Sequence, residues 1–525
     1  MLALSTTAKA TFAPLICERG RKNPVTWRLV FCGAFLAAVA AWAGGIGLWL
    51  AIAAVFGGYL ALNIGANDVA NNIGPTVGAR VMPLGAAVAM AAACEAAGAM
   101  IAGGDVVNTI RKGIIDPALI PGVDIYVWAM MAALLAAALW LNLATLFGAP
   151  VSTTHSIVGG VLGAGVAAAG FGVVHWSVLG GILASWVISP AMGAGLAALC
   201  LILIKRGITW QPDILGAAGR GVPLLAAAMA WVFSTYLLLM GLPKSASLDL
   251  FQAGFCGLWV AGAVWLLMRT HVARRLPDLR NCKNSLNRLL GIPLILAAGA
   301  LSFAHGSNDV ANAIGPLAGI VEALATGKMS NDADVPLWVL GLGALGLALG
   351  LVLFGPRLIR TVGSEITRLD AVRAYCIAMA ATLTVILASQ LGVPVSTTHV
   401  SVGALLGVGF LRERLKAQHQ AILAEIRASH SAADHARAEE FIVQFHATPF
   451  GERAALLAHL RSDSTARGAA TPRQAGPAPL GPSCRRVLVN RALVLRIIAA
   501  WVITVPATAT FAGLIYFTLR GMMLP

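Results

Sequence analysis

GANDVANNIGP at positions 65–75 decides how this chain folds, because nearly the same stretch returns at 306–316 as GSNDVANAIGP. Asp68 and Asp309 are 241 residues apart and share the frame G-x-N-D-V-A-N-x-I-G-P. The first copy ends an apolar run that begins near Leu48, where a membrane helix ordinarily excludes ionisable side chains. A polar box of this length, present twice, predicts that the chain contains an internal duplication.

The composition is typical of a polytopic membrane protein. Of the 525 residues, 58% are hydrophobic and 11% are charged, whereas soluble domains carry about 25% charged residues. The formal net charge of +15 falls mainly in a few segments between apolar runs, so we expect a lipid bilayer and not nucleic acid as the partner. The eight cysteines are scattered without a C-x-x-C pair, which favours neither a disulfide framework nor a metal site.

The apolar runs predict the number of membrane spans. A spanning helix needs about 20 apolar residues, and thirteen segments approach that length. They are 28–46, 48–66, 81–103, 126–147, 151–170, 176–204, 222–241, 250–268, 291–308, 336–355, 374–391, 395–411 and 494–518. Because 151–170 and 395–411 are short and glycine-rich, we expect them to be re-entrant or half-helices. The predicted fold class is an all-α polytopic membrane protein with broken or re-entrant helices.

Three basic segments set the predicted orientation: the N-terminus, the loop 269–290 and the segment 412–493. Placing all three in the cytoplasm agrees with thirteen spans, a cytoplasmic N-terminus and a C-terminus outside. The loop after the first polar box then faces the cytoplasm, while the loop after the second, with Glu322, Asp332 and Asp334, faces outside. Opposite orientations of the two copies predict an inverted repeat, the architecture of many secondary transporters.

A second pair of polar boxes supports the duplication. P-V-S-T-T-H occurs in each half, with Ser152 84 residues after Asp68 and Ser396 87 residues after Asp309. The predicted organisation is an N-terminal segment with an extra helix (1–47), a first transport repeat (48–204), linking helices with a basic loop (205–290), a second, inverted repeat (291–411), a cytoplasmic insert (412–493) and a C-terminal helix (494–525). The role of the insert, which contains a flexible linker at 468–482, stays open.

The first kind of box suits a cation. An acid at bilayer depth is costly unless it faces a cavity or a partner, and carboxylate and amide oxygens are hard ligands for Na⁺, or hold a proton. In each box two asparagines are spaced i,i+4 beside the acid, and the I-G-P that follows is expected to end or break the helix and to free backbone groups there. The alternative is that these groups cap or join helices, although two copies with carboxylates favour function. The predicted cation-coupling residues are Asn67, Asp68, Asn71, Asn308, Asp309, Asn312 and Glu95, an acid inside another apolar run.

The second kind of box suits an oxyanion. Proline followed by Ser and Thr favours a helix start, where N–H groups, a partial positive charge and hydroxyls can hold a tetrahedral anion. The predicted anion-binding residues are Ser152, Thr153, Thr154, Ser396, Thr397 and Thr398. His155 and His399 are proton-relay candidates or merely packed polar residues. His305, four residues before Asp309, is a third candidate that could tune the proton affinity of that acid.

With both duplicated boxes, G-x-N-D-V-A-N and P-V-S-T-T-H, the chain resembles the inorganic phosphate transporter (PiT/Pho4) family. The resemblance covers about 48–411 and the last helix. It implies uptake of inorganic phosphate across the cell membrane, driven by cotransported Na⁺ or H⁺, with the acids coupling the cation and the Ser-Thr-Thr groups contacting phosphate. Some members have another acid where this chain has Ala378, so their coupling stoichiometry does not transfer.

Other functions compete with phosphate symport. The same hydroxyls could carry another oxyanion such as sulfate, and a passive channel could not concentrate its solute. A Ser-His-Asp hydrolase is disfavoured because the boxes are duplicated and no G-x-S-x-G sequence is present, so we expect no enzymatic activity and no cofactor. The sequence leaves open whether phosphate travels free or as a metal complex, and whether the chain forms a homodimer.

Overall fold

The computed structural model describes residues 24–147, 151–242, 247–329, 335–365, 369–428, 435–466 and 491–523. Within these residues the regular elements are helices, with one isolated antiparallel bridge between Ile115 and Val174. Residues 1–55 and 56–525 form two separate compact units. The basic residues before Pro24, Asp332 and Asp334 of the predicted outer loop, and the predicted linker at 468–482 lie outside the described residues. The all-α prediction is confirmed.

The helices follow the apolar runs of the sequence. The longer ones are α1 (Pro24–Gly44), α2 (Leu48–Gly78), α3 (Leu84–Ala102), α4 (Gly104–Lys112), α5 (Val123–Leu146), α6 (Thr153–Ala169), α7 (Trp176–Ile204), α8 (Ile214–Met240), α9 (Leu250–Arg275), α10 (Lys283–Leu289), α11 (Gly291–Thr326), α12 (Leu337–Glu365), α13 (Ala371–Gln390), α14 (Thr397–Ala428), α15 (His435–Ala447), α16 (Arg453–Ala466) and α17 (Arg491–Met523). A π-helical turn, η4 (Lys205–Thr209), extends α7.

All thirteen predicted spans are helical, but fewer can cross a membrane by length and composition. Nine helices qualify in the described part of the chain, or ten when α10 and α11, which meet at a bend of 48°, count as one span. Two others, Arg28–Gly44 and α6, are shorter apolar helices. The apolar part of α14 ends near residue 411, and the helix continues through RERLKAQHQ into the insert. The predicted boundary at 411 therefore lies inside a continuous helix.

Neither helix ends at its I-G-P sequence, contrary to the expectation that the helix would end or break there. Helix α2 continues past Pro75 to Gly78, and α11 continues past Pro316 to Thr326. A proline removes one backbone hydrogen bond, a loss that membrane helices tolerate when neighbouring helices pack against them. The longer α11 also changes the position of Glu322, which was expected in a loop and is instead a buried residue of that helix.

Glycines bring α3 and α11 into backbone contact. A Cβ atom on Gly98 would overlap the carbonyl of Phe303, and a Cβ on Gly306 would overlap the carbonyl of Glu95. Small residues of this kind let membrane helices approach closely. This approach places Glu95 beside the second polar box.

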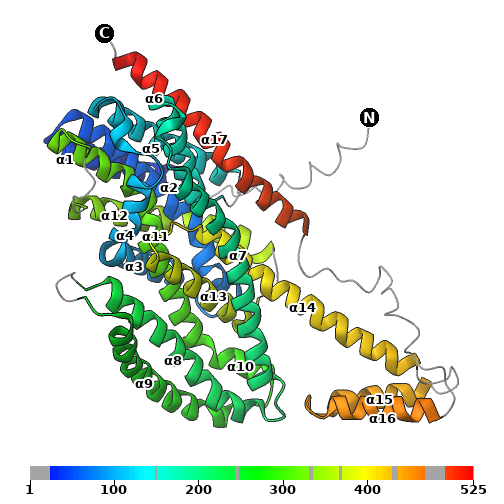
Figure 1. Cartoon of the computed structure of the whole chain (residues 1–525). Coiled ribbons are helices and arrows are strands. Elements are labelled where there is room, and N and C mark those ends of the chain that lie inside the picture. Colours follow the sequence, from blue (N-terminus) through cyan, green and yellow to red (C-terminus); the bar gives the residue numbers. More distant parts are fainter. Residues whose placement is uncertain are drawn as a thin grey trace, which may run out of the picture. The chain divides into compact units, whose positions relative to one another are not determined.

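The two helices that begin with S-T-T-H are packed in matching ways. Gly159 and Gly163 of α6 lie against the α17 backbone, while Gly403 and Gly407 of α14 lie against the backbone of α7. Figure 1 shows α7 beside α14. Each pair of glycines follows its serine at the same spacing, so the duplicated sequence produces duplicated packing.

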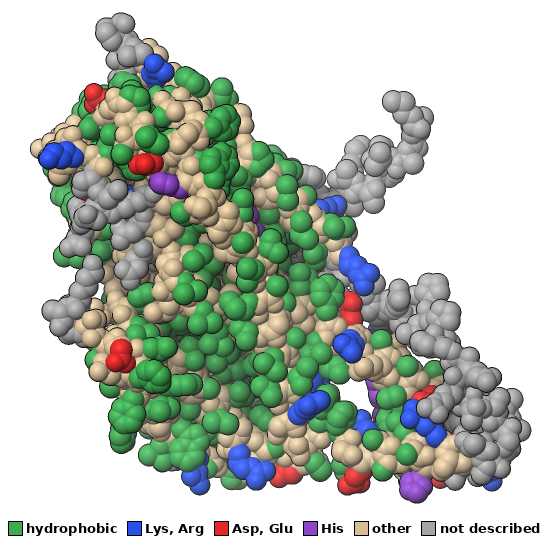
Figure 2. Space-filling view, viewed as in Figure 1, with side chains coloured by type: hydrophobic (Ala, Val, Ile, Leu, Met, Phe, Trp, Pro, Cys, Tyr) green, Lys and Arg blue, Asp and Glu red, His purple; other side chains and the backbone are tan. Residues whose placement is uncertain are grey.

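The outer surface is suited to lipid. Figure 2 shows hydrophobic side chains covering much of the visible face. Large exposed apolar residues include Val187 on α7 and Phe251 and Trp259 on α9. Continuous apolar surface of this kind is costly in water and favourable in a bilayer. The chain is therefore a multi-pass membrane protein.

The insert forms a small helical unit at the end of α14. Ile426 of α14 packs with Ile442, Phe445 and Leu457 of α15 and α16 in a separate apolar cluster. Between those two helices, Phe450 stacks on Trp210 with ring centroids 4.0 Å apart. The insert is thus joined to the end of α7 as well as to α14.

Candidate substrate and cation site

The four polar boxes meet in the interior. The N-D boxes occupy the middle of α2 and α11, and each S-T-T-H box forms the start of a helix, α6 or α14. The Thr154 hydroxyl donates to the carbonyl of Val395 at 3.1 Å, and the Asn67 amide donates to the carbonyl of Val151 at 2.7 Å. These contacts hold the two helix starts beside the two acidic boxes.

Both helix starts are capped by serine. Ser152 accepts a hydrogen bond from the His155 backbone N–H at 3.1 Å, and Ser396 accepts one from the His399 N–H at 3.2 Å. N-capping of this type satisfies first-turn donors, and the helix start carries a partial positive charge. The serine oxygens thus have a structural role in addition to the anion contact expected for them.

Threonine hydroxyls connect the carboxylates of the two copies. The Thr153 oxygen lies 3.0 Å from Asp68 Oδ2 and 3.2 Å from Asp309 Oδ2. The Thr397 hydroxyl donates to Asp309 Oδ2 at 3.0 Å, and the Thr398 hydroxyl donates to Asp68 Oδ1 at 2.9 Å. Thr153 thus reaches the acid of the second copy, and Thr398 reaches the acid of the first.

The predicted asparagines complete the network. Asn67 and Asn71 donate to Asp68 Oδ1 at 3.0 and 3.3 Å, and Asn71 also donates to the Thr398 oxygen at 3.0 Å. Asn312 donates to the Thr154 oxygen at 3.3 Å. In the amide orientation that satisfies both of its polar atoms, Asn308 donates to Asp309 Oδ1 at 3.1 Å and accepts from Ser389.

His305 lies among three acids. Its Nε2 atom is 3.1 Å from Asp309 Oδ2 and 3.6 Å from Asp68 Oδ2, while its Nδ1 atom is 3.0 Å from Glu95 Oε1. Asn72 donates to the same Glu95 oxygen at 2.7 Å. The structure therefore brings Glu95 and His305 to the acidic boxes.

The site is closed to solvent and contains more acids than bases. Asp68, Glu95, His305 and Asp309 are each 0% exposed. With three carboxyl groups around one imidazole, the fully ionised site would carry a net negative charge, and buried charge of one sign is costly unless a proton or cation offsets it. Asp68, His305 and Asp309 offer ligand atoms within 4.8 Å of one another. The three side chains could together hold a cation.

His155 and His399 occupy a different environment. Their rings lie 4.3 Å apart, centroid to centroid, between the indoles of Trp186 and Trp501, each 3.6 Å from its histidine. The four rings form one aromatic cluster among α6, α7, α14 and α17, in which the two imidazoles meet edge to face and both histidines are buried. This arrangement is what a packed polar residue at a helix start would give, and of the three relay candidates only His305 contacts the acids among the described residues.

Sequence reasoning missed several partners. Asn72 was visible inside the first box but was given no role, and Ser389 carries no motif. Arg111 of α4 forms a buried ion pair with Glu322 of α11; the pair was hidden because Pro316 was expected to end the helix. Trp186 and Trp501 could not be assigned, since only the packing of α7 and α17 brings them to the histidines.

Comparisons with known proteins identify the family of the chain. A family model described as the phosphate transporter family matches residues 64–512. A Helicobacter pylori protein named "Putative phosphate permease" is 46% identical over 493 residues, which cover 93% of this chain and 92% of that protein. A Chlamydia muridarum protein of the same name is 40% identical and covers 69% of this chain and 90% of its own length.

A solved structure titled "The sodium-dependent phosphate transporter" has the same fold. It superposes with a TM-score of 0.73 at 28% identity and covers 91% of this chain and all of that one. The family match spans both pairs of polar boxes and extends into α17. The chain belongs to the phosphate transporter family.

Proposed function

We propose that this protein is a secondary active symporter that imports inorganic phosphate across the cell membrane with Na⁺ or H⁺. The observation that carries the proposal is the meeting of Asp68, Asp309 and the threonines of both S-T-T-H boxes in one enclosed site. A relative whose title specifies sodium dependence supports Na⁺ as the first candidate. His305, which lies between the acids, supports a role for protons.

The negative charge of the site explains why a cation would accompany phosphate. Adding an anion to a buried cluster of carboxylates is unfavourable by Coulomb's law. A Na⁺ ion bound by oxygens of Asp68, Asp309 and Thr153, or a proton on one of these acids, offsets that charge. Phosphate binding therefore depends on prior or simultaneous cation binding.

The shared hydroxyls supply a second source of coupling. Thr153, Thr397 and Thr398 donate to the carboxylates in this structure. A cation that neutralises the carboxylates releases these donors, and they can then turn to the phosphate oxygens beside the starts of α6 and α14. Linkage requires the effect to be reciprocal, so phosphate raises the affinity for the cation by the same factor.

Alternating access is the transport step that the proposal requires. Asp68 and Asp309 are 0% exposed, so neither solute reaches them without movement of the surrounding helices. We propose that the segments 48–204 and 291–411 act as inverted repeats that rock about this site. The proposed orientation has a cytoplasmic N-terminus and an outer C-terminus, as the basic loops indicate.

Proteoliposomes test the proposal with one preparation. Purified protein is reconstituted, a Na⁺ gradient and a pH gradient are imposed separately, and uptake of labelled phosphate is followed. The expected result is accumulation above the external concentration under at least one gradient, and competition by unlabelled phosphate but not by sulfate. Uptake that only equilibrates under both gradients would identify a passive pathway instead.

A further inference from the structure

A basic cavity lies outside the transport site, where the ends of several helices converge. Its volume is about 160 Å³, and the charged and hydrogen-bonding side chains of its described lining are Lys205, Thr209, Lys283, Asn287, Asp370, Arg373 and Arg412. One water molecule needs roughly 10–15 Å³ of cavity volume measured in this way. The cavity is therefore large enough for a tetrahedral anion with several waters. None of these residues belongs to the polar boxes or contacts them in the network described above.

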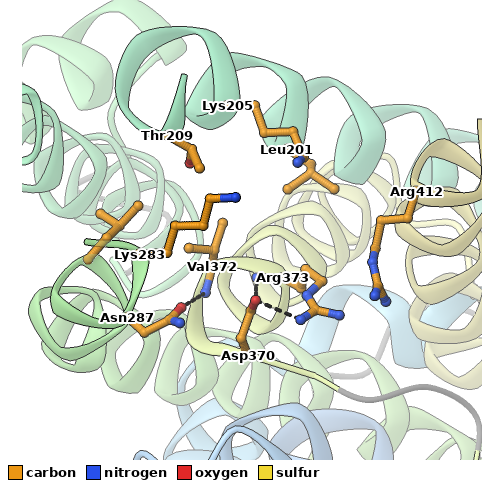
Figure 3. A pocket seen from close by; sticks show the side chains of 10 residues that line it. Leu201, Lys205, Thr209, Lys283, Asn287, Asp370, Val372, Arg373 and Arg412 are labelled. Carbon is orange, nitrogen blue, oxygen red and sulfur yellow. Dashed lines mark hydrogen bonds and ion pairs between the residues drawn. The ribbon is translucent and has the colours of Figure 1, made fainter. Parts of the chain in front are cut away.

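The cavity has a strong excess of positive charge. Four of its described lining residues are basic and one, Asp370, is acidic. Figure 3 shows Lys205, Lys283, Arg373 and Arg412 around the cavity, from η4, α10, α13 and α14. Arg373 pairs with Asp370 at 2.7 Å, and the same carboxylate also acts electrostatically on Lys205 and Arg412. With four basic side chains and one acidic side chain, the described lining has three more positive charges than negative ones.

The basic side chains are placed where their charges repel one another. Arg412 is half-buried, and burial together with the neighbouring Arg373 lowers the pKa of its guanidinium. The Lys205 ammonium lies 5.6 Å from the centre of the Trp210 ring, within the range of a cation–π contact. Clustered like charges cost free energy unless an anion offsets them.

The position of the cavity fits the surface of a membrane. Lys205 follows directly after the apolar helix α7, and Asp370 precedes the apolar helix α13. The lining residue Lys283 comes from the loop 269–290 that the charge pattern places in the cytoplasm. Basic pockets between membrane helices on this side suit the phosphate groups of anionic lipids.

We propose that this cavity binds a phosphate-bearing anion, with the phosphodiester headgroup of an anionic phospholipid as the source that its place in the fold favours. Lys205, Lys283 and Arg412 contact the phosphate oxygens, and Thr209 and Asn287 are the neutral hydrogen-bonding side chains of the lining. Free inorganic phosphate has the same chemistry and is the other source. The site is separate from the one that carries the transported phosphate.

The test compares two double variants with the same loss of charge. Lys205→Gln with Arg412→Gln removes two lining cations, whereas Arg206→Gln with Arg414→Gln removes two exposed neighbours on the same helical segments that do not line the cavity. Full-length protein, delipidated in neutral detergent, is titrated with short-chain phosphatidylglycerol, short-chain phosphatidylcholine or inorganic phosphate. The midpoint of the rise in Tm gives the apparent affinity.

We expect phosphatidylglycerol to raise the Tm of the wild type and of the Arg206/Arg414 variant with the same midpoint. The Lys205/Arg412 variant should need about thirtyfold more lipid, from roughly 1 kcal/mol for each cation near a lipid headgroup. If the cavity variant instead shifts only the response to inorganic phosphate, free phosphate is the ligand. The proposal is overturned if the two double variants have equal Tm midpoints with every probe. It is also overturned if phosphatidylcholine raises the Tm of the wild type with the same midpoint as phosphatidylglycerol.

A second pair of variants is used if the first cavity variant does not fold. If the Lys205/Arg412 variant does not purify as a single species, Lys283→Gln replaces it, with Arg280→Gln as the matched exposed control on the same segment. One cation is then removed in each case, and the expected loss is about fivefold. The same comparison of midpoints decides the outcome.

Discussion

Thr153 occupies the most demanding position of the network, because one hydroxyl proton is shared between two carboxylates. Its oxygen lies within 3.2 Å of both Asp68 and Asp309, yet it can donate to only one of them at a time. The contact to the second carboxylate therefore needs a proton or a cation between the two oxygens. That requirement makes this residue the point where cation binding and the duplicated boxes meet.

Two replacements of Thr153 test the role of its hydroxyl separately from the role of its shape. We expect Thr153→Val to weaken cation-dependent phosphate uptake by about tenfold or more, since a hydrogen bond to a charged group contributes roughly 1.5–3 kcal/mol. Thr153→Ser keeps the hydroxyl and should recover most of the activity. The measurement is the Na⁺ or proton concentration that gives half-maximal uptake; equal values for the valine and serine variants would exclude a role for the hydroxyl.

Removing one carboxylate charge tests the coupling assignment. Asp68→Asn and Asp309→Asn preserve the shape of each side chain but remove a negative charge from the cluster, so concentrative uptake should fall to the level seen without a gradient. Asp116→Asn, which alters an acid at the start of a short 3-10 helix (Pro117–Leu119) away from the cluster, serves as the control. Near-normal accumulation by either site variant, at equal membrane insertion, contradicts the assignment.

At the scale of the helices, the contact between α3 and α11 positions the acidic cluster. Glu95 comes from α3, while His305 and Asp309 come from α11, and their side chains meet because Gly98 and Gly306 let the two backbones touch. The same helix α11 carries Glu322 to its buried partner Arg111. A small change in the separation of α3 and α11 would therefore disturb the acidic cluster.

Two glycines of α11 provide a matched pair for this contact. Gly306→Ala would place a Cβ against the carbonyl of Glu95, whereas a Cβ on Gly299 meets nothing closer than 3.6 Å. We expect Gly306→Ala to cost about 1–3 kcal/mol of stability through overpacking and to abolish uptake. Gly299→Ala should leave Tm and uptake unchanged or slightly raised, because alanine favours helix. Equal Tm and uptake for the two variants would show that α3 and α11 can separate freely.

For the whole molecule, the periodicity of apolar residues and the internal duplication predicted more of the structure than any single motif did. Each of the thirteen predicted spans coincides with a helix, and the repeated boxes contain most of the side chains that converge in the interior. The helix ends were harder to predict, because Pro75 and Pro316 break a helix only when nothing packs around it. Contacts between distant helices, such as Trp186 with His155 or Arg111 with Glu322, depend on packing that no local pattern encodes.

The transport core is expected to work without the insert. Its apolar cluster is separate from the transport core, so replacing residues 429–490 with a flexible linker should preserve phosphate uptake. Uptake by the shortened protein is compared with that of the full chain at equal expression. Complete loss of uptake in a correctly inserted protein would make the insert a necessary part of transport.

An experimental density map of the protein in lipid, with phosphate and Na⁺ bound, would test directly whether both copies of the repeat form one site. We expect phosphate density between the starts of α6 and α14, in contact with threonines of both copies, and ion density beside Asp68 and Asp309. Phosphate bound by one copy alone, or a cation held away from both acids, would contradict it.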